Sequence, residues 1–143
     1  MTSPRRVSPK EAQDLIEKEG YVYVDVRSVG EFEQGHPTGA FNVPLAQPGP
    51  GGMAPNPDFL SVMLANFPLA EKLVVGCQAG GRSARAVAML AQAGYENLVD
   101  QRAGWGGARD SFGGVQEAGW SAAGLPAEAG PSAKGYAALA AKK

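Results

Sequence analysis

The sequence predicts an α/β fold with a mainly parallel central sheet and helices on both faces of that sheet. Two observations lead to this prediction. Apolar runs of strand length alternate along the chain with segments of helical periodicity, and the run 72–76 (KLVVG) is apolar after its first residue, as expected for a strand buried on both faces. At 143 residues, 44% of them hydrophobic, the chain can form one core, so we expect a single domain.

The first predicted helix begins after Ser8 and ends at Gly20. Ser8 has the side chain of an N-cap, Pro9 suits the first helical position, and Glu11 completes a capping box. Residues 1–7 precede this helix and are expected to form a flexible tail.

The next segments predict two strands and an exposed loop. Residues 21–26 alternate with period two, which predicts a strand with Asp25 near its carboxyl end. Residues 35–40 form a turn, and 41–44 form a brief strand stopped by proline. The Gly- and Pro-rich stretch 47–57 is expected to be an exposed loop without regular structure.

The second half predicts helices over 58–67, with Asp58 as cap, and over 84–94, with Gly94 as its stop. Residues 97–100 read as a short strand. The glycine-rich stretch 102–119 is expected to be an irregular loop whose role the sequence does not define, and 127–143 an Ala-rich C-terminal tail or frayed helix.

Composition excludes several classes of function. Thirteen Lys and Arg against 14 Asp and Glu give a net charge of −1, so we expect no nucleic-acid or membrane partner. One cysteine and one histidine cannot form an intrachain disulfide or a typical metal site, so no metal and no cofactor are expected. The single thiol and the lack of a signal-peptide pattern favour a reducing, cytoplasmic location.

The candidate site is the segment 77–83 (CQAGGRS), which joins the buried strand 72–76 to the helix that follows. A glycine-bearing loop at a helix N-terminus directs backbone N–H groups inward and adds a partial positive charge, which makes a cradle for an anion. Cysteines at helix starts have pKa values that fall from about 8.5 to between roughly 3.5 and 7.5. Cys77 is therefore a candidate nucleophile near neutral pH. Arg82 can hold an oxyanion or clamp a carboxylate such as Asp25.

Position alone also permits a plainer interpretation, in which Cys77 is a small buried apolar residue and the glycines only make a tight turn. The placement at a strand end, two consecutive glycines and an arginine at the helix start together favour the functional interpretation.

These motifs resemble the rhodanese family, whose active-site loop has the form Cys-x-x-Gly-x-Arg-Ser. The resemblance covers roughly residues 8–126. Within the family, the chain is similar to the single-domain branch that includes plant senescence-associated members. Four motifs occur in the family's order: 25–27 (DVR), 35–44 (GHPTGAFNVP), 77–83 (CQAGGRS) and 124–126 (GLP). The stretch between Asp100 and Trp120 is longer than the family pattern.

The resemblance implies a three-layer rhodanese-like fold over 8–126 and a thiosulfate sulfurtransferase activity. Cys77 would carry a sulfane sulfur as a persulfide, which Gln78, Ala79, Gly80, Gly81, Arg82 and Ser83 would bind. The implied partners are small sulfur-containing anions such as thiosulfate or persulfides, with a thiol or a protein as a further acceptor. Asp25 would brace the loop, with Arg82 as the candidate contact, and Arg27 would lie near the pocket. His36 is expected to be structural.

Two alternatives of other classes remain. A phosphatase or arsenate reductase of the same fold usually has five residues between its cysteine and arginine, whereas four separate Cys77 from Arg82 here. A noncatalytic interaction module usually lacks the cysteine. The sequence does not rank the physiological donors and acceptors, nor does it define the oligomeric state.

Overall fold

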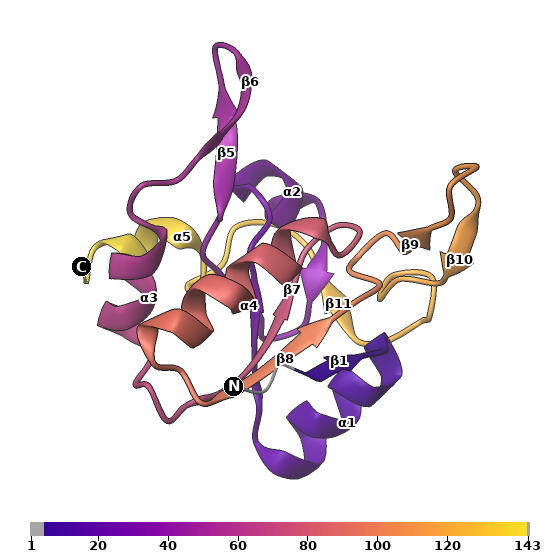
Figure 1. Cartoon of the computed structure of the whole chain (residues 1–143), viewed down its shortest axis with the longest axis horizontal. Coiled ribbons are helices and arrows are strands. Elements are labelled where there is room, and N and C mark those ends of the chain that lie inside the picture. Colours follow the sequence, from indigo (N-terminus) through magenta and orange to yellow (C-terminus); the bar gives the residue numbers. More distant parts are fainter. Residues whose placement is uncertain (1–4, 143) are drawn as a thin grey trace.

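Five parallel strands form the centre of the structure. The computed structural model describes residues 5–142 (Figure 1). Its helices are α1 (Pro9–Glu19), α2 (Val29–Gln34), α3 (Phe59–Asn66), α4 (Gly81–Ala93) and α5 (Tyr136–Ala140). Its strands are β1 (Arg5–Val7), β2 (Val22–Asp25), β3 (His36–Pro37), β4 (Phe41–Asn42), β5 (Ala46–Gly49), β6 (Gly52–Pro55), β7 (Lys72–Gly76), β8 (Asn97–Gln101), β9 (Ala108–Arg109), β10 (Val115–Glu117) and β11 (Ala127–Glu128).

The central sheet has the order β1-β8-β7-β2-β4, and every neighbouring pair in it is parallel. Strand β7 occupies the middle, and its residues after Lys72 are buried, as the continuous apolar run predicts. Because all five strands are parallel, their carboxyl ends meet at one edge of the sheet. The segments that follow β2, β7 and β8 therefore converge there.

Helices cover both faces of the sheet. On one face the core includes side chains of α3, α4 and α5, such as Met63, Leu90 and Leu139. On the other face it includes α1 and α2, through Leu15 and Phe32. The predicted three-layer α/β fold with a mainly parallel sheet is confirmed. None of the helices within residues 5–142 combines the length and apolar character needed to span a bilayer.

The start of α1 follows the predicted capping box. The Ser8 hydroxyl accepts a hydrogen bond from the Glu11 N–H at 3.1 Å, and the Ser8 N–H donates to the Glu11 carboxylate at 2.9 Å. Gly20 ends the helix with φ 75°, a left-handed conformation that glycine adopts at low cost. The sequence signals at both ends of this helix are confirmed.

The predicted flexible tail over 1–7 is wrong for its second half. Arg5–Val7 form the edge strand β1, which pairs with β8 from Arg5 opposite Val99 to Val7 opposite Gln101. Val7 is 1% exposed and packs in the core beside α1. Three residues are too few to show a periodicity, so the strand is specified by its partner rather than by its own sequence. Residues 1–4 of the expected tail lie outside the described part of the chain.

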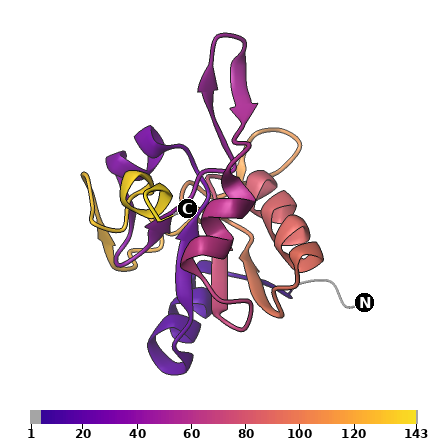
Figure 2. The same ribbon diagram turned by 90° about the vertical axis from the view of Figure 1, so that its left-hand side faces the viewer.

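Two segments that were expected to be irregular contain hairpins. Within 47–57, β5 and β6 form an antiparallel ribbon that stands clear of the body (Figure 2). Pro50 and Gly51 make its two-residue turn, and prolines are compatible with this ribbon because both of its strands are edge strands. Within 102–119, β9 and β10 form a second, shorter hairpin.

The end of the chain is more ordered than the predicted tail or frayed helix. Strand β11 pairs with β3, and α5 packs against the body through Leu139, which is 3% exposed. Helix α5 has only five residues, and it is held by the apolar contacts of Leu139 and by hydrogen bonds from Asn56 and Asn66. Helix α2 was not predicted, although Ser28 and Glu31 form a capping box at its start.

The burial of Val7 leads to a prediction about the edge strand. We expect Val7→Ala to lower the free energy of unfolding by about 2 kcal/mol, because it leaves a cavity in the core beside α1. Arg5→Ala, an exposed change in the same strand, is the matched control and should alter that free energy by less than about 0.5 kcal/mol. Urea unfolding of both variants measures the difference. Equal effects would mean that β1 contributes little to the core.

Candidate functional site

The segment 77–80 leaves the carboxyl end of the central strand β7 and enters helix α4 at Gly81. Cys77 directly follows the strand and is 2% exposed. On one side β2 ends at Asp25, and on the other β8 ends at Gln101. The parallel sheet therefore brings residues from three separate parts of the sequence to the same loop.

The sulfur of Cys77 faces the backbone and one side chain of its own loop. The Gly80 N–H donates a hydrogen bond to Sγ over 3.1 Å, and Sγ lies 3.6 Å from the Ser83 hydroxyl oxygen. The N–H groups of the first turn of α4 have no acceptor within a helix, and they add the positive end of the helix dipole. One backbone N–H and the start of α4 therefore lie beside this sulfur.

Gly80 is needed for this geometry. Its φ of +101° lies in the left-handed region, and a Cβ at this position would overlap the carbonyl oxygen of Arg102. A side chain would thus have to displace the segment after β8 or turn the Gly80 N–H away from the sulfur. The loop conformation and the hydrogen bond to Cys77 depend on the same glycine.

Ser83 belongs to a chain of polar contacts that begins on the edge strand. Its hydroxyl lies 2.6 Å from Asp100 Oδ1, and Asp100 Oδ2 accepts a hydrogen bond from Arg6 Nε at 2.9 Å. Ser83 and Asp100 are both buried. Because the hydroxyl has one proton, donation to the carboxylate leaves an oxygen lone pair for the Cys77 thiol.

The backbone of the loop is held by the segment that follows β8. The N–H groups of Trp105 and Gly106 donate to the carbonyl oxygens of Cys77 and Gln78 at 2.8 and 2.9 Å. Gly104 permits this close approach, since its φ is +68° and a Cβ there would overlap the backbone of Cys77 and Gln78. The first residues of the long 101–119 segment therefore support the loop.

Arg27 provides the side-chain brace. It is 2% exposed and pairs with the equally buried Asp25, with Nη2 2.7 Å from Oδ2. Its Nη1 donates to the Gln78 side chain at 3.2 Å, and its guanidinium lies 5.2 Å from the centre of the Trp105 ring. Arg27 was expected to lie near the pocket, and its contact to the loop runs through Gln78.

The predicted contact between Arg82 and Asp25 is wrong. Arg82 instead binds Glu31 through two hydrogen bonds of 2.7 and 3.0 Å, while Asp25 is occupied by Arg27. Glu31 comes within reach because its capping box with Ser28 starts α2 beside the loop. Sequence reasoning missed this helix, and the pattern Ser-x-x-Glu at 28–31 was the signal that could have found it.

The Arg82–Glu31 pair changes the titration of both groups. Hydrogen bonding from Arg82 is the main cause that lowers the pKa of Glu31 to about 2, against an ordinary value of 4.5. The same bond raises the pKa of Arg82, and the nearby charge of Cys77 acts in the same direction. Arg82 is thus a permanent cation within electrostatic range of the cysteine.

His36 lies away from the loop and is fully buried. It stacks on Phe32 at 3.7 Å between ring centres, and its ring nitrogens contact the Phe32 carbonyl and the Glu128 carboxylate. These contacts agree with the structural role expected for it. No group of three or more His, Cys, Asp or Glu side chains within residues 5–142 is arranged to hold a metal ion.

Comparison with known proteins was made for the sequence and for the fold. The family model described as rhodanese-like domain matches residues 8–108. The chain is 40% identical over 126 residues to thiosulfate sulfurtransferase 16, chloroplastic, of Arabidopsis thaliana, covering 88% of this chain and 94% of that protein. It is 35% identical to senescence-associated protein DIN1 of Raphanus sativus over 71% of this chain and 55% of the relative.

Among solved structures, the crystal structure of Rv0390 from M. tuberculosis matches with a TM-score of 0.74 and 26% identity. The match covers 90% of this chain and all of that one. The Arabidopsis relative is named as chloroplastic, so the comparisons give no support to the cytoplasmic location expected from the sequence.

The buried pair leads to a prediction about stability. We expect Asp25→Asn and Arg27→Gln each to lower the free energy of unfolding by about 3 kcal/mol, because each leaves the other partner buried without its opposite charge. The double variant should lose less than the sum of the two. Urea unfolding of the four proteins measures this coupling. Arg82→Gln combined with Asp25→Asn is the matched control, and an equally large coupling there would contradict the assignment of the brace.

The lowered pKa of Glu31 leads to a prediction about pH. A carboxylate whose pKa falls on folding stabilises the protein above the unfolded-state value near 4.5, and this stabilisation is lost as pH falls toward 2. We expect Glu31→Gln to be less stable than the native chain by a constant amount above about pH 5.5. The difference should shrink between pH 4.5 and 2, as measured by unfolding at a series of pH values. A difference that is unchanged at pH 2.5 would mean that the charge of Glu31 is not what stabilises the loop.

Proposed function

Because the chain belongs to the rhodanese-like domain family and is a sulfurtransferase, we propose that it moves a sulfane sulfur from a donor such as thiosulfate to a thiophilic acceptor through a persulfide on Cys77. One observation carries the proposal. Cys77 is the chain's only cysteine, and it lies at a strand end with a backbone N–H directed at its sulfur.

The reaction has two displacements. The Cys77 thiolate attacks the outer sulfur of thiosulfate, the S–S bond of the donor breaks, and sulfite leaves with the bonding electron pair. The enzyme then carries Cys77 as a persulfide. A nucleophile such as cyanide or a thiolate attacks the terminal sulfur, and the Cys77 thiolate leaves. The products are thiocyanate or a new persulfide, and no oxidant or reductant is consumed.

The loop is suited to both charged states of this cycle. Negative charge resides on Sγ before the first step and on the terminal sulfur after it, and the Gly80 N–H with the positive end of α4 favours negative charge at this position. Ser83 is held by Asp100 next to the same sulfur. The fixed Gly80 N–H needs little rearrangement during the reaction, and a thiolate nucleophile needs no separate general base.

The contacts of Arg82 bear on the phosphatase and arsenate reductase alternative. An oxyanion of phosphate size needs a wide loop and a guanidinium free to bind its oxygens. Here four residues separate Cys77 from Arg82, and both terminal nitrogens of Arg82 are bound to Glu31. A single sulfur atom needs neither a wide loop nor a free arginine side chain. The noncatalytic alternative is disfavoured by the presence of Cys77 in the cradle.

The proposal predicts that Cys77→Ser folds but loses thiosulfate:cyanide sulfur transfer. Serine preserves the size of the side chain but forms no persulfide. The intact mass of the native chain should rise by about 32 Da after incubation with thiosulfate and return to its first value on addition of cyanide. The serine variant should show no such change, with circular dichroism as the control for folding.

More than a few per cent of native activity in Cys77→Ser would contradict the assignment of the sulfur carrier. Robust hydrolysis of an aryl phosphate by the native chain, lost in the same variant, would instead favour the phosphatase alternative.

A further inference from the structure

Two hairpins flank the catalytic loop. The β5–β6 hairpin lies beyond the end of β4, and the β9–β10 hairpin lies beyond the end of β8, so both are at the same edge of the sheet as Cys77. Figure 1 shows the two hairpins projecting from the body on either side of the start of α4.

Positive charge is concentrated on the surfaces beside the loop. A pocket of about 430 Å³ beside Ala79 is lined by Arg6, Arg102 and Arg109, and one of about 500 Å³ on the other side of the loop is lined by Arg82 and Arg85. Five of the seven arginines in the sequence therefore surround the loop, although the whole chain has a net charge of −1.

Only two carboxylates line the same two pockets. Glu117 binds Arg102 and Glu31 binds Arg82, while Arg6 pairs with Asp100. Arg85 and Arg109 form no ion pair with any residue in the range 5–142. One uncompensated cation thus lies on each side of the loop.

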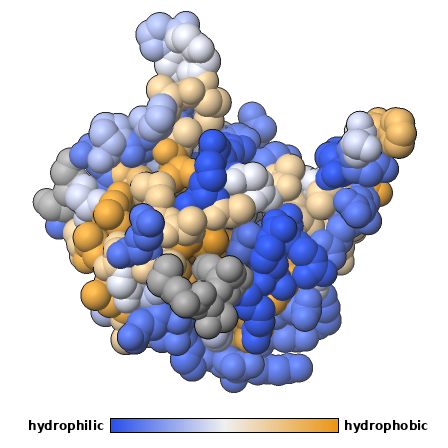
Figure 3. Space-filling view, viewed as in Figure 1, coloured by the Kyte–Doolittle hydropathy of each residue, from blue (hydrophilic) through white to orange (hydrophobic). Residues whose placement is uncertain are grey.

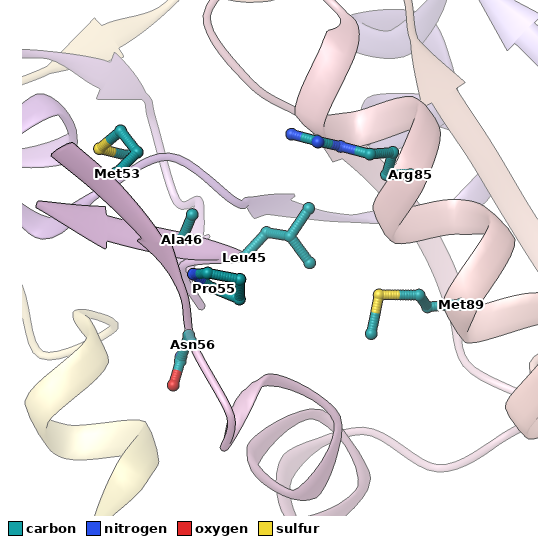
Figure 4. Close-up of a pocket in the computed structure, with 7 residues that line it drawn as sticks. All are labelled: Leu45, Ala46, Met53, Pro55, Asn56, Arg85 and Met89. Atoms are coloured by element: carbon teal, nitrogen blue, oxygen red, sulfur yellow. The ribbon is translucent and has the colours of Figure 1, made fainter. Parts of the chain in front are cut away.

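Exposed apolar groups accompany these cations. An apolar groove of about 400 Å³ separates the β5–β6 hairpin from α4, and Figure 4 shows Arg85 and Met89 extending from the helix toward Leu45 and Pro55. Met53 lies further out on the hairpin and is 52% exposed. This groove shares Met53 and Arg85 with the pocket that contains Arg82, so the apolar surface continues toward the loop.

The second hairpin carries its own exposed apolar group. Phe112 lies in the turn between β9 and β10 and is 96% exposed, and Val115 in β10 is 57% exposed. Figure 3 shows hydrophobic residues at the far end of this projection. An exposed aromatic ring of this kind offers a large apolar contact area to a partner.

A small anion would explain the arginines but not these apolar groups. Thiosulfate has no apolar surface, and it is much smaller than the pockets of about 430 and 500 Å³ beside the loop. Because Cys77 is 2% exposed, the reacting sulfur of a partner must be on a segment narrow enough to reach it. An exposed loop or chain end of a protein meets that requirement, and complementary charge would speed its approach.

We propose that the surface between the two hairpins docks an acidic, cysteine-bearing segment of a protein that accepts the sulfur. This rests on the sulfurtransferase function proposed above. The partner's cysteine thiolate attacks the terminal sulfur of the Cys77 persulfide, the bond between the two sulfur atoms of that persulfide breaks, and Cys77 leaves as a thiolate. The partner then carries the persulfide. Its carboxylates face Arg85 and Arg109, and its apolar side chains contact Met53 and Phe112.

A pair of synthetic peptides tests the proposal. One has a central cysteine flanked on each side by a glutamate and a leucine, and the other has lysine in place of glutamate. With thiosulfate saturating, kcat/KM for sulfur transfer to each peptide is measured by the gain of about 32 Da in the peptide. We expect the acidic peptide to be about tenfold better at low ionic strength, with the preference largely lost in 0.5 M salt.

Three variants test which residues cause the preference for the acidic peptide. In Arg85→Glu combined with Arg109→Glu, the preference should reverse toward the lysine peptide. Arg5→Glu, an exposed change in β1 that lines neither pocket, is the matched control and should leave the preference intact. Phe112→Ser should lower kcat/KM for the acidic peptide severalfold while thiosulfate:cyanide transfer stays unchanged.

Equal rates for both peptides, in an enzyme that retains thiosulfate:cyanide transfer, would overturn the docking proposal and leave the proposed function standing. If sulfur transfer itself were absent, peptide binding would be measured to test the docking proposal. The acidic peptide with serine in place of cysteine should still bind the native chain, and bind the Arg85→Glu, Arg109→Glu variant at least several times more weakly. Equal binding to both proteins would overturn the proposal without reference to turnover.

Discussion

The buried guanidinium of Arg27 is the contact on which the rest of the site depends. It joins the end of β2 to the loop that contains Cys77, since it binds Asp25 on one side and Gln78 on the other, and it lies against the ring of Trp105. A buried cation is costly unless every direction around it is satisfied. The three segments that meet at the carboxyl edge of the sheet are therefore held in one arrangement, and the loop cannot shift without breaking these bonds.

Charged side chains and the groups that contact the sulfur have different roles at this site. The charged side chains are occupied with one another, as Arg27 is with Asp25 and Arg82 with Glu31, whereas the sulfur is met by a backbone N–H and a hydroxyl. This division fits a chemistry in which a small, soft atom carries the charge. It also explains how the site can function with a single histidine that lies elsewhere, stacked on Phe32.

The sequence predicted what is encoded locally. The period of 21–26, the apolar run 72–76 and the capping box at Ser8 each specify one element, and Cys77 with its glycines specifies the loop. The sequence did not predict the pairings between distant segments. Arg82 could have bound either of two carboxylates, and only the position of α2 decides for Glu31. Likewise, β1 has three residues and the β5–β6 hairpin is rich in proline, so neither has a pattern that identifies a strand.

The edge strand β1 is far from Cys77 in the sequence, but a short chain of contacts links the two. Arg6 binds Asp100, Asp100 binds Ser83, and Ser83 contacts the sulfur, so the edge strand is three contacts from the sulfur of Cys77. A change that removes Arg6 would then take away the ion-pair partner of Asp100 as well as a residue of the edge strand. The surroundings of the cysteine thus depend on the same residue as the edge of the sheet.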